Sequence, residues 1–512
     1  MRWQPVLTLT YAVFALISCT WAQQRDNCAS LLNFKMPGVE VTKASAIAGG
    51  TTEPNPWGPG HSAPIPAYCR VEGVIDRRTG VGGEEFGIRF ALAMPAHWNG
   101  DFLMQGGGGS NGVVMPPLGL NAAGDKPALM RGFAVVSTDT GHQSHHPGFD
   151  FSFTKDQQAY LDFAYLANAK VANLAKQLIA DFYGKPAAYS YFSGCSTGGR
   201  EGMILSQRYP TIFNGIISGD PAMRTGLSNL AIGKWIPIAF NQIAPKDAEG
   251  KPIITQAVTD ANRKLIKDAL LKQCDAKDGV ADGLISDPLG CDFDPETLVC
   301  KDGQTDSCLE PKKAAAIKKA FGGPKTSTGV QVYSGFLYDT GITASSPIRG
   351  LLVPGPGIFG PATTAMEVDV AKEALADIQP LTDSTATNLT TFSGSGGKLI
   401  FYHGDSDPWF SALDTFGYYK DMAAANGGLD SVLKWSQFYF IPGMGHCAGG
   451  SFDSFDFLTA MVNWVEKGTE PTSVIATGKA FPERSRPLCP YPKHAQYKGQ
   501  GNTEDARNFE CR

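Results

Sequence analysis

A serine set between glycines, in Gly194-Cys195-Ser196-Thr197-Gly198, is the first pattern in this sequence that could do chemistry. In a turn from strand to helix, such glycines permit the tight backbone that exposes the serine hydroxyl. The N–H after the serine then lies at a helix start, where it can stabilise an oxyanion. We therefore interpret Ser196 as a nucleophile and the backbone of Thr197 as an oxyanion donor. A glycine-rich turn with a capping serine is the alternative interpretation.

A serine nucleophile needs a general base, and an imidazole base needs an acceptor that holds its tautomer. In α/β-hydrolases the acid and then the histidine follow the serine, on loops after late strands. His446 follows a strand-like run that ends at Ile441, and Asp405 and Asp407 follow one that ends at Tyr402. We predict that His446 is the base and that Asp407 orients it. Asp405 is the alternative, although its side chain could merely cap the turn.

Two cysteines stand beside these candidates, since Cys195 precedes Ser196 and Cys447 follows His446. If the two cysteines pair, their disulfide ties the serine turn to the histidine loop. Such a bond would limit the drift between the nucleophile and its base.

The run Gly106 to Gly109 follows an early strand, where this class of enzyme places its second oxyanion donor. Close approach of the backbone to a substrate would explain the glycines. A flexible surface loop is the alternative.

An acidic loop between Cys274 and Cys291 carries Asp275, Asp278 and Asp282 with interleaved glycines. Carboxylates and carbonyls in a tight loop supply the oxygen ligands that calcium takes, and the loop lacks the sulfur and imidazole that zinc prefers. We predict a structural Ca²⁺ here, in a spacing that is not that of an EF-hand. A solvated acidic turn is the alternative.

Strand-like and helix-like runs alternate around these motifs, which predicts an α/β fold with the serine turn between a strand and a helix. Strands are expected at 86–94, 101–104, 132–137, 189–192, 215–218, 398–402 and 435–441, and helices at 160–182, 200–208 and 455–466. Polar loops, four cysteines and a Gly/Pro-rich stretch distinguish residues 223–395. We expect an α/β-hydrolase core in two parts, 23–222 and 396–512, with an inserted calcium-binding lid domain at 223–395.

The 512 residues carry a formal net charge of -5 and no run of Lys or Arg, which argues against a nucleic-acid partner. Residues 1–22 are typical of a secretory signal peptide, and no later segment predicts a membrane span. The alternative is a bacterial lipoprotein signal, in which Cys19 would be acylated and anchor the chain to a membrane. Removing Cys19 from the eleven cysteines leaves ten, an even number that favours five disulfides in an exported protein. Proximity suggests Cys274 with Cys291 and Cys300 with Cys308.

Five motifs taken together resemble the tannase and feruloyl esterase family over nearly the whole mature chain: GCSTGGREG from Gly194, CDAKDGVADG from Cys274, FYHGDSDPWF from Phe401, IPGMGHC from Ile441 and RPLCPYP from Arg486. The resemblance implies a secreted serine esterase whose lid domain holds one calcium ion. It implies the catalytic residues Ser196, Asp407 and His446, and so supports Asp407 over Asp405.

The resemblance also implies ligands and disulfides at matching positions. The oxyanion donors would be the backbone of Gly109 and Thr197. The calcium ligands would be the side chains of Asp275, Asp278 and Asp282 with the carbonyls of Val280 and Leu284. The implied disulfides are Cys28–Cys69, Cys195–Cys447, Cys274–Cys291, Cys300–Cys308 and Cys489–Cys511.

The substrate predicted from this resemblance is an aromatic acid ester of the feruloyl or galloyl type. One member of the family hydrolyses mono(2-hydroxyethyl) terephthalate and holds the free carboxylate of its substrate with a lid arginine. This sequence has no arginine between Arg349 and Arg484, and it has Thr197 where that enzyme has an acidic residue. A terephthalate monoester is therefore the alternative substrate. Two further hypotheses are a peptidase and a non-catalytic, calcium-stabilised binding protein on a hydrolase scaffold.

Overall fold

The computed structural model describes residues 26–54, 61–144, 149–345, 348–355 and 362–512. The predicted signal peptide and Cys19 lie outside these residues. In the described part of the chain, every helix is too short or too polar to cross a bilayer. The chain divides into two compact units, residues 1–193 with 212–214 and residues 194–211 with 215–512.

The first unit is built on a mixed sheet with the strand order β1-β2-β3-β5-β4-β6. Its strands are β1 (Val39–Ile47), β2 (Tyr68–Thr79), β3 (Glu85–Pro95), β4 (Phe102–Gln105), β5 (Ala134–Thr138) and β6 (Ser190–Cys195). The neighbouring pairs β1/β2, β2/β3 and β3/β5 are antiparallel. Strand β4 pairs in parallel with β5 and with residues 190–193 of β6. Strands β1 and β2 are absent from the sequence prediction. In β2, the charged Arg70 and Glu72 pair with each other on one face of the sheet, and the apolar Cys69 and Val71 are buried on the other.

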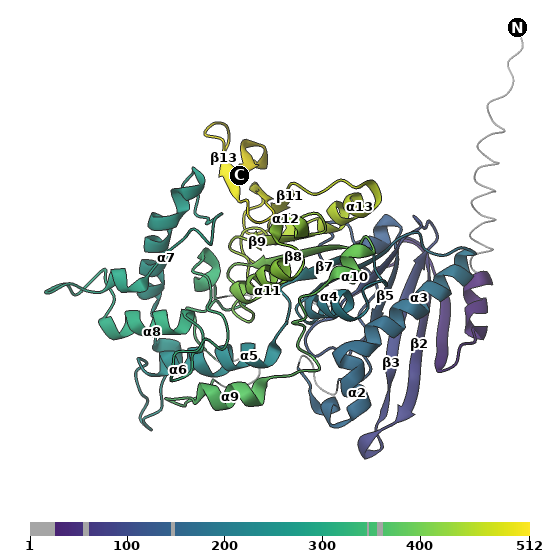
Figure 1. Ribbon diagram of the computed structural model, residues 1–512, viewed down its shortest axis with the longest axis horizontal. Helices are drawn as coiled ribbons and strands as arrows, with labels where there is room; N and C mark the ends of the chain where they lie inside the picture. The colour runs from purple at the N-terminus through teal and green to yellow at the C-terminus, as the bar shows by residue number, and fades with distance from the viewer. Residues whose placement is uncertain (1–25, 55–60, 145–148, 346–347, 356–361) are drawn as a thin grey trace, which may run out of the picture. The chain divides into compact units, whose positions relative to one another are not determined.

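One long helix covers part of this sheet, and it confirms the helix predicted at 160–182. Helix α2 (Gln157–Leu161) runs through one π turn into α3 (Ala167–Tyr183). The Asp156 carboxylate caps its start by accepting a hydrogen bond from the Ala159 N–H. Helix α3 packs against β3 and β5 (Figure 1). The buried residues of the helix form an apolar stripe at helical spacing that includes Val171, Leu174, Leu178 and Phe182.

The second unit contains three parallel strands in the order β7 (Gly215–Gly219), β8 (Lys398–Gly404) and β9 (Ser436–Ile441). Nearly all their residues are buried, as expected of parallel strands with helices on their faces. Helix α4 (Thr197–Arg208) packs on β7, α13 (Phe457–Lys467) on β7 and β8, and α11 (Ala412–Ala425) on β8 and β9. Because the strands are parallel, the loops after β7, β8 and β9 leave from one edge, where α/β proteins place their sites.

Five helices in the second unit lie within the predicted lid residues and share a hydrophobic cluster of their own. They are α5 (Thr225–Leu230), α6 (Ile236–Asn241), α7 (Asp260–Cys274), α8 (Pro311–Phe321) and α9 (Val370–Asp377), drawn in teal and green in Figure 1. Leu230, Phe240, Ile266, Ile317 and Tyr333 are among the buried side chains of this cluster. The lid limits at 223 and 395 stay a prediction.

Candidate active site

Ser196 lies in a strained turn between β6 and α4. Its φ of 64° and ψ of -122° fall in a region that side-chain-bearing residues rarely adopt, at a cost of about 1–3 kcal/mol. Two backbone hydrogen bonds hold this geometry: the Ser196 N–H donates to the Gly219 carbonyl, and the Ala222 N–H donates to the Ser196 carbonyl, each over 3.0 Å. The strand–turn–helix context predicted for the nucleophile is therefore present.

Close packing explains two of the glycines in the motif. A Cβ atom at Gly194 would lie 2.6 Å from the carbonyl oxygen of Gly198, and a Cβ atom at Gly199 would lie 2.2 Å from that of Gly219. A side chain at Gly194 would push the strand away from the start of α4, and one at Gly199 would push α4 away from β7. The glycines thus allow the turn that presents Ser196.

Asp407 and His446 form a buried hydrogen-bonded pair. The Nδ1 atom of His446 lies 2.7 Å from Oδ2 of Asp407, and the backbone N–H groups of Trp409 and Phe410 donate to Oδ1 over 2.8 and 3.1 Å. With Nδ1 as the donor, the neutral imidazole keeps a lone pair on Nε2 for a proton. Burial opposes ionisation of Asp407, but the charge of His446 and the contacts with His403 and His446 outweigh it and hold the pKa below its usual value.

Asp405 does not share this arrangement. Its side chain is buried, and neither carboxylate oxygen has a hydrogen-bond partner within the part of the chain that the structure describes. Burial, reinforced by the negative charges of Asp339 and Asp220, raises its pKa well above the ordinary value. The structure thus brings Asp407, and not Asp405, to His446.

Five disulfides form, in the pairs that the sequence resemblance implies: Cys28–Cys69, Cys195–Cys447, Cys274–Cys291, Cys300–Cys308 and Cys489–Cys511. The bond between Cys195 and Cys447 joins the neighbours of Ser196 and His446 across 252 residues of sequence. The Cys447 sulfur lies 3.6 Å from Nε2 of His446. The disulfide therefore fixes the base loop to the nucleophile turn.

Two aromatic rings lie beside the imidazole of His446. The ring centroids of Trp409 and Phe410 lie 4.6 and 5.3 Å from that of His446. Phe410 is buried, whereas Trp409 is partly exposed. The indole offers a flat apolar surface next to the imidazole.

The predicted oxyanion donors lie in different units. Thr197 is the first residue of α4, where the helix dipole favours negative charge. Gly109 follows β4 in the first unit, with a φ of 58° that suits glycine. Their roles as donors stay predictions.

The predicted calcium loop concentrates buried carboxylates. Asp275 accepts hydrogen bonds from the N–H groups of Asp282 and Gly283, each over 2.9 Å, and Asp278 accepts one from Ser286 Oγ over 2.6 Å. Asp282 pairs with Arg486 through one oxygen, while its other oxygen has no partner in the described residues. Burial, with the charges of Asp282 and Asp275, raises the pKa of Asp278 to about 6.

The residues present suit a cation in their chemistry, because Asp275 and Asp278 have no ion-pair partner within the described residues and one oxygen of Asp282 has no hydrogen-bond partner there. Within the described residues, sets of three ligand atoms within 4.8 Å of one another occur around Asp220 and not in this loop. The calcium ligands stay a prediction.

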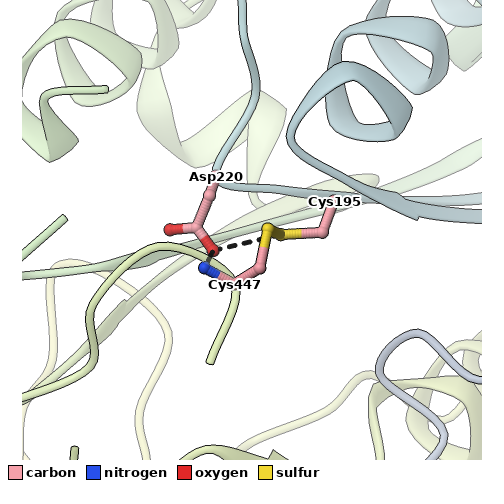
Figure 2. A group of neighbouring side chains, drawn as sticks. All are labelled: Cys195, Asp220 and Cys447. Carbon is pink, nitrogen blue, oxygen red and sulfur yellow. Dashed lines mark hydrogen bonds between the residues drawn. A yellow bond between two sulfur atoms is a disulfide. The ribbon is translucent and has the colours of Figure 1, made fainter. Parts of the chain in front are cut away.

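Two further residues that the sequence did not single out as functional lie at this site. Asp220 directly follows β7, and its side chain contacts the disulfide and the base loop (Figure 2). His403 lies in β8, and its Nε2 atom is 3.4 Å from Oδ2 of Asp407. The position of Asp220 at the carboxyl end of a parallel strand is the signal that could have found it.

A serine in a strand-to-helix turn, followed along the chain by a hydrogen-bonded Asp–His pair after later parallel strands, defines a hydrolase of the α/β type. The family model described as "Tannase and feruloyl esterase" matches residues 69–351 and 361–512. The chain belongs to this family and is therefore a carboxylic ester hydrolase.

Relatives extend over almost the whole chain. It is 36% identical to mono(2-hydroxyethyl) terephthalate hydrolase of Piscinibacter sakaiensis, over 88% of this chain and 85% of that protein. It is 30% identical to a probable feruloyl esterase B-2 of Aspergillus terreus, over 99% and 98%. The crystal structure of feruloyl esterase B from Aspergillus oryzae superposes with a TM-score of 0.77 at 25% identity, over 96% of this chain and 100% of that one. These likenesses confirm the predicted α/β-hydrolase fold, and the calcium-binding lid stays a prediction.

Proposed function

We propose that the protein hydrolyses esters of aromatic acids through an acyl-enzyme formed on Ser196. The observation that carries the proposal is the buried Asp407–His446 pair, whose loop is bonded to the nucleophile turn through Cys195–Cys447. Nε2 of His446 takes the proton of the Ser196 hydroxyl as its oxygen attacks the ester carbonyl. The same proton is then given to the leaving alcohol. Water, deprotonated by His446, releases the acid and regenerates the serine.

The negative charge that develops on the carbonyl oxygen needs fixed donors. The N–H of Thr197 at the start of α4 is one such donor, and the N–H of Gly109 is the second in this proposal. Asp407 does not take up the proton. It holds the imidazole in the productive tautomer and stabilises the imidazolium.

An aromatic substrate is supported by the indole of Trp409 beside the base and by the names of the relatives. A flat ring that stacks on an exposed aromatic face gains about 0.5–1.5 kcal/mol beyond its area burial. Feruloyl and galloyl esters have such a ring on the acyl side. A terephthalate monoester also has one, but it carries a free carboxylate, and the residues between Arg349 and Arg484 include no arginine to bind it. We therefore place the terephthalate monoester second.

Substrate turnover and covalent labelling test this proposal together. The wild type is assayed with methyl ferulate, methyl gallate and mono(2-hydroxyethyl) terephthalate, and with an amide of ferulic acid to detect peptidase-type activity. A fluorophosphonate should label Ser196, and Ser196→Ala should abolish both turnover and labelling while the melting temperature stays close to that of the wild type. Labelling elsewhere, or undiminished turnover by Ser196→Ala, would refute the mechanism. Absence of any adduct would favour a binding protein without catalytic activity.

Calcium and export complete the proposal. The carboxylates of Asp275, Asp278 and Asp282 would hold Ca²⁺, which would neutralise their charge and brace the loop between Cys274 and Cys291. Five disulfides support an oxidising compartment outside the cytosol. Signal-peptide processing and lipid anchoring at Cys19 are told apart by mass spectrometry of the mature N-terminus.

A further inference from the structure

Asp220 is a buried carboxylate whose two oxygens bind two different loops. The side chain has no exposed surface. Its Oδ1 accepts a hydrogen bond from the backbone N–H of Gly404 over 2.7 Å, and its Oδ2 accepts one from the N–H of Cys447 over 3.1 Å. Figure 2 shows the second of these bonds, with the carboxylate next to the disulfide. Each oxygen thus satisfies a backbone donor that would otherwise be buried without a partner.

The two loops are those of the catalytic acid and the catalytic base. Gly404 ends β8 three residues before Asp407, and Cys447 follows His446. Asp220 therefore links the two loops that carry Asp407 and His446, whose hydrogen bond orients the imidazole. A carboxylate of fixed shape sets the distance between the two donors that bind it.

The nucleophile turn meets Asp220 as well. The carbonyl of Gly219, the residue before it, accepts the N–H of Ser196. The sulfur of Cys195 lies 3.2 Å from Oδ2 of Asp220. That sulfur carries no proton, because it is bonded to Cys447, so this is a packing contact and not a hydrogen bond donated by the thiol. The disulfide and the carboxylate therefore hold the base loop at the same point.

The imidazole of His403 lies between the carboxylates of Asp220 and Asp407. Its Nε2 lies 3.6 Å from Oδ1 of Asp220, 3.4 Å from Oδ2 of Asp407 and 3.0 Å from the Phe410 carbonyl. All three neighbours are acceptors, so Nε2 carries a proton. An N–H placed between two carboxylates attracts both and lowers their mutual repulsion.

We propose that Asp220 is a positioning residue that fixes the acid loop to the base loop behind the Asp407–His446 pair. It touches no substrate and acts through those two residues, so its role rests on the proposed function. A residue that only fills buried hydrogen bonds would affect stability alone. A positioning residue must also affect the rate of the chemical step and its pH profile.

The substitution Asp220→Asn separates these roles, because the amide has nearly the same shape but offers one acceptor and no charge. One of the two backbone N–H groups, that of Gly404 or that of Cys447, then loses its acceptor, and the acid loop and the base loop move apart. We expect kcat for methyl ferulate to fall about 10- to 100-fold with KM little changed, since misplacement on the order of 1 Å has that effect. Burial raises the pKa of Asp220 to about 6, so this carboxylate becomes protonated on the acidic limb of the pH profile of kcat/KM, and we expect Asp220→Asn to lose that contribution to the limb. The titratable groups that face Asp220 are His403, Asp407, His446, Tyr402 and Asp405.

A second variant of Asp220 and a control variant at another buried carboxylate separate the positioning role from an effect on stability alone. Asp220→Glu retains the charge and both acceptors but adds a methylene, so kcat should fall while the acidic limb stays in place. Asp414, a buried carboxylate of the same unit that pairs with Arg224, serves as the control. Asp414→Asn should lower the melting temperature and leave kcat and the acidic limb as in the wild type.

Two results would overturn the assignment: Asp220→Asn with wild-type kcat and acidic limb, or, where Asp220→Asn does not fold, Asp220→Glu with wild-type kcat. The rate of fluorophosphonate labelling is measured for every variant alongside turnover. A wild type that neither turns over esters nor reacts with the probe refutes the proposed function itself. A reactive wild type matched by the Asp220 variants refutes the positioning role alone.

Discussion

The side chain of Asp407 accepts a hydrogen bond from Nδ1 of His446 over 2.7 Å, and its other oxygen is held by two backbone N–H groups of its own turn. The carboxylate is therefore immobile before any substrate binds. Asp405, two residues earlier, points to a buried region where its oxygens have no partner in the described part of the chain. Two acids of one turn thus have opposite surroundings and should respond differently to the same substitution.

Replacing each acid by asparagine tests this difference. Asp407→Asn should lower kcat by about 10⁴-fold, because the amide donates to the imidazole and selects the wrong tautomer. Asp405→Asn should leave kcat close to the wild-type value, since that side chain does not contact His446. Steady-state kinetics with methyl ferulate measures both. Equal losses for the two variants would contradict the assignment of Asp407.

Asp405 should also make the stability of the protein depend on pH. Burial raises its pKa in the folded state well above the value of about 3.9 expected in the unfolded chain. Between these two pKa values the folded protein keeps a proton that the unfolded chain has released, so stability falls as pH rises. Below the unfolded pKa both states are protonated and the effect vanishes.

Urea unfolding from about pH 4 to about pH 8 measures this linkage. Asp405→Asn cannot ionise, so its free energy of unfolding relative to the wild type should increase with pH, by at most about 1.4 kcal/mol per unit. Asp430→Asn, an exposed acid of the same unit, serves as the control and should run parallel to the wild type. A parallel curve for Asp405→Asn would show that the buried carboxyl is not kept protonated.

The order Ser196, Asp407 and His446 could be proposed from the sequence because each residue follows a local signal. Ser196 lies between glycines, Asp407 follows β8, and His446 follows β9. The choice between Asp405 and Asp407 could not be made from position alone, since both leave the same strand end. Only the tertiary contact with His446 separates them.

Asp220 illustrates the limit of local patterns. Its place after β7 could have marked it as a residue of the site, but its backbone partners are 184 and 227 residues away in sequence, so its contacts with both loops could not be predicted. Strand β2 does carry a local signal, since Cys69 and Val71 alternate with the charged Arg70 and Glu72, the pattern of a half-buried strand. That strand could therefore have been predicted from the sequence, whereas the contacts of Asp220 depend on long-range pairing.

The disulfide between Cys195 and Cys447 should contribute to both stability and rate. Replacing both cysteines by alanine removes a crosslink that spans 252 residues, and the chain entropy that the unfolded state regains is worth about 5.5 kcal/mol of stability. It also frees the base loop from the nucleophile turn, so kcat should fall. Cys300→Ala with Cys308→Ala is the matched control, because that link spans 8 residues, is worth about 2.5 kcal/mol and lies away from the triad in sequence. Thermal unfolding and kcat are measured for both pairs. An equal loss of kcat in the two variants would contradict the role of the first disulfide.

Calcium should stabilise the folded protein if the loop from Asp275 to Leu284 binds it. After dialysis against a chelator, adding calcium to about 100 times its dissociation constant should raise the free energy of unfolding by about 2.7 kcal/mol. Scanning calorimetry with and without calcium measures the gain, which Asp278→Asn should abolish. Asp287→Asn, a nearby acid outside the predicted ligand set, should retain it. If calcium raises the melting temperature of Asp278→Asn as much as that of the wild type, the ion binds elsewhere.

Trp409 should determine the preference for aromatic substrates. Its indole is partly exposed and lies 4.6 Å, centroid to centroid, from His446, while its backbone N–H holds Asp407. Trp409→Leu removes the ring and keeps that N–H, so the catalytic pair stays oriented. We expect kcat/KM for methyl ferulate to fall about 2- to 12-fold, the equivalent of a lost aromatic contact of about 0.5–1.5 kcal/mol.

The comparison that isolates this contact uses a substrate without a ring. For methyl butyrate, kcat/KM of Trp409→Leu should stay close to the wild-type value, because no stacking is lost. Phe481→Leu removes an exposed aromatic ring elsewhere in the same unit and so controls for a general loss of aromatic surface. It should leave kcat/KM unchanged for both methyl ferulate and methyl butyrate. Equal losses for methyl ferulate and methyl butyrate would show that Trp409 supports the imidazole and does not select the substrate.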